Sequence, residues 1–301
     1  MATPIAATSP LRRARTYASF VRLEHTLFSL PLLIAGVFSA PGPALGAGRW
    51  ALIAIAAVGA RTAALALNRL IDRRLDALNP RTRTRELPSG AMSGAEAWTL
   101  LLVASLAYLA ACAALGAWYL RVAVIPLAVF AIYPYLKRWT SLCHLGVGTA
   151  LALSPLAGYA AAHPDLARPG PALWLAGFAL CWVTGFDIIY ATLDEAFDRE
   201  HGVHSLVVRL GRRRALVVSA LLHAAAFVCV ALAGYGVLHA SDHHALWGGW
   251  ATGELLVGVG LLLLIEQKKS ANVDLAFFKV NVWVGFFVLA MVLAARAAGG
   301  F

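Results

Sequence analysis

Long apolar segments separated by short polar connections dominate the chain. Apolar runs bounded by charged, Gly or Pro residues give nine segments, each near the length of about 20 residues that crosses a bilayer as a helix. They cover residues 17–40, 49–71, 94–114, 119–136, 142–162, 172–193, 213–238, 245–265 and 275–298. The pattern therefore predicts an all-α integral membrane protein with about nine transmembrane helices.

The composition agrees with this pattern. Apolar residues make up 60% of the 301-residue chain and charged residues only 13%, about half the charged fraction of a soluble globular domain. That balance excludes a soluble globular enzyme. Because the nine segments leave no long stretch outside them, we expect residues 1–301 to form a single transmembrane domain.

The positive charge is unevenly distributed. The chain has 25 Lys and Arg against 15 Asp and Glu, a formal net charge of +10. Most of the basic residues fall in the N-terminal arm, residues 1–16, and in the connections after the second, fourth, sixth and eighth segments. Because Lys and Arg gather in cytoplasmic loops, this distribution predicts a cytoplasmic N-terminus. It gives no indication of a nucleic-acid partner.

The cysteines and the first residues bear on the compartment. The four cysteines lie in or beside apolar segments without a C-x-x-C pair, which indicates neither a disulfide framework nor a zinc site. No apolar stretch with a cleavage site precedes the first long segment, so we expect no cleaved secretory signal and favour a bacterial inner membrane. Because the first acidic residue is Glu24, a mitochondrial transit peptide, and hence the mitochondrial inner membrane, is the alternative.

Two longer connections, residues 72–93 and 194–212, lie on the predicted cytoplasmic side and carry most of the reactive side chains. The first connection begins in an N-x3-D-x3-D pattern formed by Asn68, Asp72 and Asp76. Steps of four residues place these side chains on one stripe of a helix. The stripe is expected near the cytoplasmic face of the membrane.

The second connection has a similar acidic start. Asp187, Asp194 and Asp198 follow one another at steps of seven and four residues, and Tyr190 lies one turn from the first two. This spacing again favours a single helical stripe. The two stripes are therefore expected at the same face of the membrane.

Neighbouring carboxylates near a low-dielectric region repel each other unless a cation lies between them. Mg²⁺ fits this requirement because it prefers oxygen ligands, takes one or two carboxylates and completes its shell with substrate phosphates. The two stripes could therefore bind a diphosphate through bridging metal ions. The alternative is that the carboxylates are helix ends paired with adjacent arginines, which are Arg69, Arg73, Arg74 and Arg199.

These motifs resemble those of the UbiA superfamily of intramembrane aromatic prenyltransferases. The first motif of that family is N-x3-D-x3-D and the second is a D-x6-D-x3-D stretch, and the chain matches both without gaps. A third family element, Y-x3-K, is present as Tyr133-Pro-Tyr-Leu-Lys137 and is followed by Arg138. All three lie in order at the expected helix ends, and the resemblance covers most of the chain.

The resemblance implies nine helices around a central cavity that opens sideways to the lipid bilayer. It also implies an Mg²⁺-dependent transfer of a polyprenyl group from polyprenyl diphosphate to an aromatic acid. Asn68 would orient a metal-bound water or a phosphate oxygen, and Asp187, two turns deeper, would bind metal or position the acceptor in a catalytic role. The implied metal ligands, which are also catalytic, are Asp72, Asp76, Asp194 and Asp198.

Basic and aromatic side chains near the stripes are further candidates. Lys137 and Arg138 would clamp the diphosphate, although they could also serve only as cytoplasmic anchors. Arg85, in the basic loop that follows the first stripe, could close over the diphosphate once it binds. Tyr133 and Tyr190 could stabilise an allylic cation through their aromatic faces, or could serve only in packing.

Arg61 lies in the middle of a predicted span, where an unpaired charge costs several kcal/mol. It shares a helical stripe with Asn68 and lies about 10 Å deeper. A carboxylate on the aromatic acceptor would be a fitting partner, and Glu24 or Asp187 could equally pair with Arg61 structurally. Arg22, near the cytoplasmic end of the first segment, is a further candidate substrate-binding residue.

The segment R-L-E-H-T-L-F-S-L-P at residues 22–31 is similar to the 4-hydroxybenzoate polyprenyltransferase-like branch of the family. That branch includes enzymes of a menaquinone route that prenylate 1,4-dihydroxy-6-naphthoate. Both acceptors carry a carboxylate and a ring hydroxyl, so ubiquinone and menaquinone biosynthesis both stay open. The prenyl chain length and the oligomeric state also stay open.

Two other functions are alternatives to this interpretation. A haem-type or chlorophyll-type acceptor is the nearest alternative within the family. A membrane transporter is less favoured, because transporters keep charges near the bilayer midplane whereas these aspartates cluster at one face.

Overall fold

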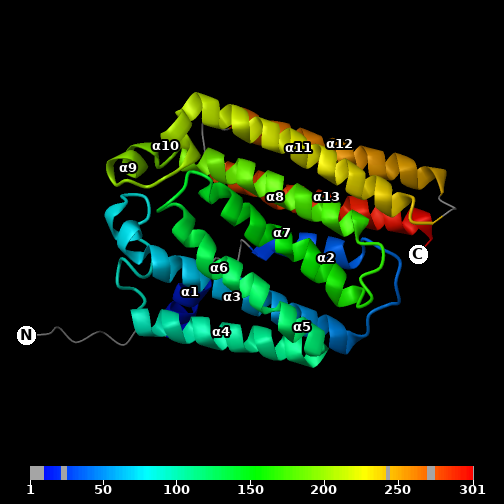
Figure 1. The fold of residues 1–301 in the computed structure, drawn as a ribbon, viewed down its shortest axis with the longest axis horizontal. Coiled ribbons are helices and arrows are strands. Elements are labelled where there is room, and N and C mark those ends of the chain that lie inside the picture. Colours follow the sequence, from blue (N-terminus) through cyan, green and yellow to red (C-terminus); the bar gives the residue numbers. More distant parts are fainter. Residues whose placement is uncertain (1–9, 22–25, 242–244, 270–274, 301) are drawn as a thin grey trace, which may run out of the picture.

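A computed structural model of the chain describes residues 10–21, 26–241, 245–269 and 275–300. Within these ranges the chain forms thirteen helices and no β-strand (Figure 1). The helices are α1 Pro10–Phe20, α2 Thr26–Val37, α3 Ala47–Leu78, α4 Gly94–Leu115, α5 Ala117–Val122, α6 Val124–Leu136, α7 Cys143–Ala162, α8 Gly170–Ala191, α9 Glu195–Glu200, α10 Leu206–Leu210, α11 Arg212–Leu238, α12 Leu246–Lys269 and α13 Leu275–Gly299. The prediction of an all-α fold is confirmed.

Eight helical units in the described part of the chain are long and apolar enough to cross a membrane. These units are α3, α4, the consecutive α5 and α6, α7, α8, α11, α12 and α13. They correspond to eight of the nine predicted segments. The first predicted segment, 17–40, differs: the described residues there form the separate helices α1 and α2, and residues 22–25 lie outside the description.

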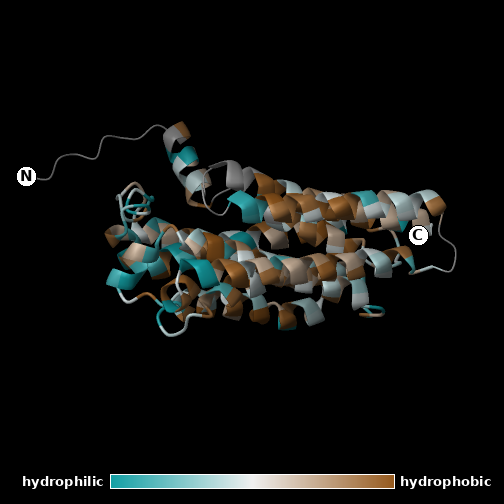
Figure 2. Ribbon diagram, turned by 90° about the horizontal axis from the view of Figure 1, so that it is seen from above, coloured by the Kyte–Doolittle hydropathy of each residue, from teal (hydrophilic) through white to brown (hydrophobic). Residues whose placement is uncertain are grey.

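The long helix α3 carries the first acidic stripe out of the membrane. Its 32 residues extend over about 48 Å at 1.5 Å per residue, whereas the hydrocarbon core of a bilayer is about 30 Å thick. The last turns of α3 therefore project beyond the hydrocarbon and bring Asp72 and Asp76 to the headgroup region. Figure 2 shows the most hydrophilic segments gathered mainly at one end of the bundle, with hydrophobic helix surface along its middle.

The helix α8 lies between α7 and α11 in the bundle (Figure 1) and carries the centre of the largest apolar cluster, which includes Phe178 and Trp182. This cluster also contains a polar contact inside the bundle. Trp182 Nε1 donates to Glu266 Oε2 at 3.3 Å and to Asn281 Oδ1 at 3.2 Å. Glu266 is fully buried, so the indole and the amide give α12 a fixed partner on α8 and α13.

Close backbone contact fixes α2 against α7. A Cβ atom added at Gly158 would lie 1.9 Å from the carbonyl oxygen of Leu33, and one added at Gly36 would lie 2.0 Å from that of Pro155. Only glycine fits at both positions. This contact places Ser29, on the same helix α2, beside α7, where its carbonyl accepts a hydrogen bond from Ser154 Oγ at 2.8 Å.

The amphipathic helix α1 holds the loop that follows α3. Phe20 is fully buried in a cluster with Leu87 and Met92 of that loop. Ser19 Oγ donates to Glu86 Oε1 at 2.5 Å, and Arg13 pairs with Glu96 at the start of α4 at 2.6 Å. The N-terminal helix and residues 79–93 therefore pack as one unit.

We expect the substitution Phe20→Ala to loosen this unit. Truncation of a buried Phe costs about 3 kcal/mol of packing, and local opening controls access of proteases to a loop. In detergent, trypsin should cleave the variant faster in the arginine-rich loop 79–93 than it cleaves the parent protein. Leu11→Ala is the matched control, because Leu11 on the same helix is 76% exposed. Equal cleavage of both variants and the parent would show that α1 does not hold the loop.

Candidate functional site

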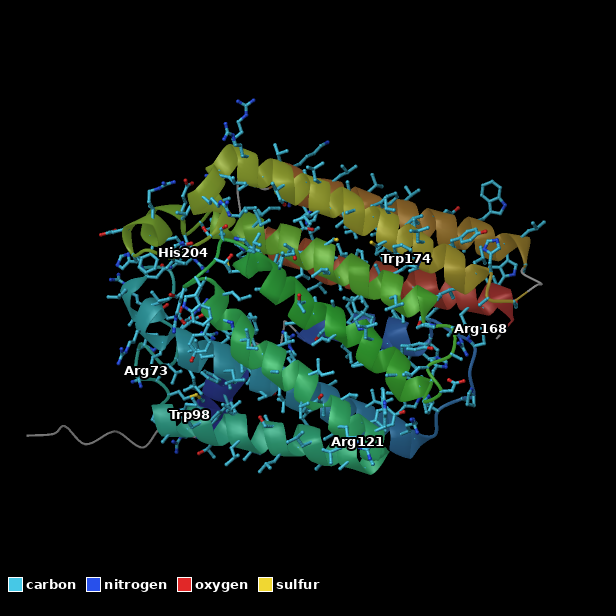
Figure 3. All side chains as sticks on the ribbon, in the orientation of Figure 1. Arg73, Trp98, Arg121, Arg168, Trp174 and His204 are labelled. Atoms are coloured by element: carbon cyan, nitrogen blue, oxygen red, sulfur yellow. The ribbon has the colours of Figure 1, made fainter. Side chains whose placement is uncertain are left out.

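The side chains predicted to form the site lie at one end of the bundle. The helices α3, α6 and α8 end there, and the connections that follow them, with α9 and α10, cover this end (Figure 1). Figure 3 shows Arg73 and His204 at this end and Arg121 and Arg168 at the opposite end. The three sequence motifs therefore meet at one face of the bundle, here termed the polar end.

The first acidic stripe lies on α3 with a cation on each carboxylate. Asp72 and Asp76 are 3% and 7% exposed. Lys137 Nζ lies 2.5 Å from Asp72 Oδ2, and Arg85 Nη1 contacts both oxygens of Asp76, at 2.8 and 2.9 Å. Asn68 Nδ2 also donates to Asp72 Oδ2, at 3.3 Å. Two different connections thus supply the positive charge that this stripe requires.

The second acidic set does not follow a single helix. The helix α8 ends at Ala191, and α9 begins at Glu195 with Asp194 as its N-terminal flanking residue. Asp187 therefore lies on α8, whereas Asp194 and Asp198 belong to the following short helix. The prediction of one continuous stripe is wrong here, because the chain turns after Ala191: the N–H of Asp194 bonds to the Ala191 carbonyl at 3.2 Å.

The loop after α3 supplies the partners of Asp194. Asn79 Nδ2 donates to Asp194 Oδ1 at 2.9 Å. Arg81 donates to the same oxygen through Nε at 2.9 Å and forms a short contact to Oδ2 through Nη2. The two acidic sets are thereby joined by one segment, since residues 79–85 reach Asp194 with Arg81 and Asp76 with Arg85.

The two carboxyl groups of α9 respond differently to their surroundings. Burial acts to raise the pKa of Asp194, but the hydrogen bonds from Arg81 and Asn79 outweigh it and hold that pKa below its usual range. Burial raises the pKa of Asp198 to about 6, and the charge of Asp194 adds to this effect. Asp198 is therefore the carboxylate of this pair that gains more from a bound cation.

The donor set fits a magnesium ion that shares its coordination with a phosphate group. Oδ1 of Asp72 is buried and has no hydrogen-bond partner among the residues that the structure describes, so a carboxylate oxygen is available for a cation. No three His, Cys, Asp or Glu side chains in the described ranges converge as a metal site. Because Mg²⁺ usually takes one or two carboxylates and completes its shell with substrate phosphates, the carboxylates would hold it together with a diphosphate.

The remaining basic candidates differ in position. Arg138 is exposed, donates to the carbonyl of Ile71 at 2.8 Å and lies over the ring of Tyr135, 4.7 Å from its centroid. It therefore packs against the backbone of α3 next to Asp72 without forming an ion pair with that carboxylate. Arg22, Glu24 and His25 lie outside the described residues.

An apolar cavity of about 620 Å³ lies within the bundle, and its lining runs from Tyr133 and Phe186 on the side of the polar end to Trp118 and Tyr119 towards the opposite end. Arg61 and Tyr133 line it, together with Ser29, whose Oγ accepts from Arg61 Nη1 at 3.3 Å. Tyr190 lies one turn beyond Phe186, with ring centroids 4.7 Å apart. The candidate residues thus divide between the charged mouth and the wall of an apolar chamber.

Sequence reasoning missed His144 entirely. This residue, in the first turn of α7, has its Nδ1 2.7 Å from Asp187 Oδ2. A single His at the start of an apolar segment carries no spacing signal, and its partner is 43 residues away on another helix. The role of Asn79 was also missed, because an Asn before a Pro reads first as a turn residue.

Comparison with known proteins identifies the family. The family model described as the UbiA prenyltransferase family matches residues 29–285. The chain belongs to the UbiA prenyltransferase family. It is 30% identical over 277 residues to a 4-hydroxybenzoate octaprenyltransferase of Shewanella pealeana, covering 89% of this chain and 92% of that protein. A protein of the same name from Coxiella burnetii is 32% identical over 239 residues, covering 77% and 78%.

Solved structures of UbiA homologues share the fold. The apo structure of a UbiA homolog from Aeropyrum pernix K1 has a TM-score of 0.79 and 32% identity, and the match covers 90% of this chain and 98% of that one. A UbiA homolog from Archaeoglobus fulgidus bound to GPP and Mg²⁺ has a TM-score of 0.71 at 19% identity, covering 94% and 99%. The protein is therefore an integral membrane prenyltransferase of the UbiA family.

The pairing of Lys137 with Asp72 gives a stability prediction. Lys137→Met should lower the unfolding free energy in detergent by about 2 kcal/mol, because it leaves the buried carboxylate of Asp72 without a counter-ion. Arg138→Met is the matched control, since Arg138 is exposed and contacts a backbone carbonyl. Thermal unfolding of the two variants checks this. Equal midpoints would contradict the assigned pairing.

Proposed function

We propose that this UbiA-family protein transfers a polyprenyl group from polyprenyl diphosphate to the ring of an aromatic acid in quinone biosynthesis. One observation carries the proposal: Asp72, Asp76 and Asp194, each paired with a cation, lie at the polar end with Asp198 on α9, and an apolar cavity lined by Arg61 lies deeper in the bundle. The names of the relatives, 4-hydroxybenzoate octaprenyltransferases, support an aromatic acid as acceptor.

The mouth provides what a diphosphate leaving group requires. Asp72, Asp76, Asp194 and Asp198 would hold Mg²⁺, which would neutralise the negative charge that develops on the departing diphosphate. Three cations already lie against these carboxylates: Arg81 and Arg85 from the connection after α3, and Lys137 from the end of α6. The connections 72–93 and 194–212 would form the active-site loops. Arg138, which packs against the backbone of α3, would add positive charge at longer range.

The cavity provides what the two organic groups require. Its apolar wall excludes water from an allylic cation and accommodates isoprenoid carbons, and the faces of Tyr133 and Tyr190 could stabilise the cation. Arg61 supports an acid as acceptor, because a guanidinium forms paired hydrogen bonds with a carboxylate. Asn68 would orient the phosphate end and Asp187 the acceptor, between these two regions.

The proposed orientation places the polar end in the cytoplasm of a bacterial inner membrane. The excess of Lys and Arg in the N-terminal arm and in the connections at the polar end supports it. Water-soluble acceptors and metal ions would reach the site from that side, while the isoprenoid tail extends into the bilayer.

A direct assay tests the proposal. Purified membranes that contain the protein would receive a long polyprenyl diphosphate and either 4-hydroxybenzoate or 1,4-dihydroxy-6-naphthoate, with Mg²⁺ or with EDTA. We expect metal-dependent prenylation of one of the two acids, and the preferred acid assigns the pathway. Absence of product from both acids, with the folded protein present, would overturn an aromatic acid as the acceptor.

The metal assignment predicts that Asp72→Asn and Asp194→Asn each reduce transfer by at least about 10³-fold while the protein stays folded, because each removes a charged oxygen ligand. Binding of Mg²⁺ with a non-hydrolysable prenyl diphosphate analogue should weaken in parallel, measured by calorimetry. Glu195→Gln is a matched control, because Glu195 adjoins Asp194 but pairs with Arg199 at the surface. Full activity in either aspartate variant would remove that residue from the metal set.

Arg61→Ala should raise the KM for the aromatic acid by about tenfold or more, because a charge-assisted pair with its carboxylate is lost. The KM for the prenyl diphosphate should change by less than about twofold. Steady-state kinetics with each substrate varied in turn measure both. Equal losses for the two substrates would instead indicate that Arg61 is part of a structural ion pair.

A further inference from the structure

His144 has two partners, one on each side of its ring. Nδ1 lies 2.7 Å from Oδ2 of Asp187 on the neighbouring helix α8. On the other side, the backbone N–H of Leu206, the first residue of α10, points to Nε2 at 3.2 Å. The His144 side chain is 5% exposed, whereas that of Asp187 is 33% exposed. The ring is therefore enclosed, and the carboxylate it contacts is accessible.

These contacts determine which ring nitrogen carries the proton. A backbone N–H can only donate, so Nε2 must accept from Leu206 and carry no hydrogen. The proton of the neutral ring is then on Nδ1 and is donated to Asp187. In many enzyme sites a hydrogen-bonded carboxylate fixes the orientation of a histidine ring. Here the roles are reversed, and the fixed ring of His144 sets the orientation of the Asp187 carboxylate. Oδ1 of Asp187 has no hydrogen-bond partner among the described residues.

The second contact of His144 belongs to a larger junction. The N–H of His204 bonds to the carbonyl of Lys137 at 2.7 Å, and Cys143 Sγ donates to the carbonyl of His204 at 3.3 Å. Arg209 Nη1 donates to Ser141 Oγ at 3.1 Å. The connection that carries the second acidic set is thereby fastened to the start of α7, with His144 as the member of the junction that faces Asp187.

Asp187 lies on α8 beside residues that line the cavity. Phe186 and Val183, its neighbours on α8, line the cavity, as does Tyr133. Tyr133 is within electrostatic range of both Asp187 and Arg61. Asp187 precedes Asp194 by seven residues and lies on α8 itself, so it is deeper in the bundle than Asp194. Asp187 therefore lies on the cavity side of Asp194, near Tyr133.

We infer that His144 is a positioning residue that orients Asp187 to accept the proton released from the acceptor ring; the inference rests on the proposed function. In the reaction the allylic C–O bond breaks and its electron pair leaves with the diphosphate. A ring carbon donates an electron pair to form the new C–C bond. The C–H bond at that carbon then breaks, its electrons restore the aromatic ring, and the proton passes to Asp187 and on to water.

Two variants of His144 separate positioning from mere packing. His144→Leu fills the space without either hydrogen bond and should lower kcat by about 30-fold, with less than a twofold change in the KM for the prenyl diphosphate. His144→Gln should recover kcat to within about threefold of the parent, because its amide N–H can donate to Asp187 while its carbonyl accepts from Leu206. Thermal unfolding in detergent checks that both variants are folded.

A double-mutant cycle and a junction control complete the test. Asp187→Asn combined with His144→Leu should be no slower than Asp187→Asn alone, because a residue that acts through Asp187 has no effect once that carboxylate is gone. Ser141→Ala loosens the same junction through Arg209 without contacting Asp187, and it should retain kcat within about twofold.

Three results would overturn the inference while leaving the proposed function intact. The first is a kcat of the double variant that is lower than that of Asp187→Asn alone by the full factor seen for His144→Leu. The second is failure of folded His144→Gln to recover kcat, and the third is a loss of kcat in Ser141→Ala equal to that in His144→Leu. An inactive parent protein with every acceptor would instead refute the proposed function. The two failures are therefore distinguishable in one set of assays.

Discussion

Carboxylates held close together at the edge of a hydrocarbon layer must be neutralised, and the polar end of this protein is arranged around that requirement. Removing such groups from water is costly unless a cation and further hydrogen bonds compensate. Asp72 receives Lys137 from the connection after α6, while Asp76 and Asp194 receive Arg85 and Arg81 from the connection after α3. The long basic loop is thus a structural part of the site.

The same requirement explains why distant parts of the chain pack at this end. A loop that presents arginines to carboxylates has to be held, and α1 holds it through Phe20 and through Ser19 on Glu86. The connection of the second acidic set is held by backbone and side-chain contacts to the segment after Lys137. Packing and hydrogen bonds thereby hold in place both the basic connection after α3 and the connection that carries the second acidic set.

Periodicity revealed the helices and the first stripe because both depend on local sequence. The four-residue steps from Asn68 to Asp76 survive because α3 is continuous to Leu78. The same reasoning failed after Asp187, since spacing alone does not show that α8 stops at Ala191. Contacts between helices, such as that of Trp182 with the buried Glu266, depend on how the helices pack. The pattern of a single sequence does not predict this packing.

Depth along α3 separates the chemical tasks of the site. Arg61 precedes Asp72 by eleven residues and so lies about 16 Å deeper along α3. This separation has room for an aromatic ring and an allylic unit between Arg61, which would bind the acceptor carboxylate, and the carboxylates that would hold the diphosphate. Asp72, Asp76 and Asp194 are already paired with cations, so they are poor proton acceptors. Asp187 differs because it faces the imidazole of His144 rather than a lysine or an arginine, and its side chain is 33% exposed. Asp187 is therefore better suited than these three paired carboxylates to accept a proton released from the acceptor ring.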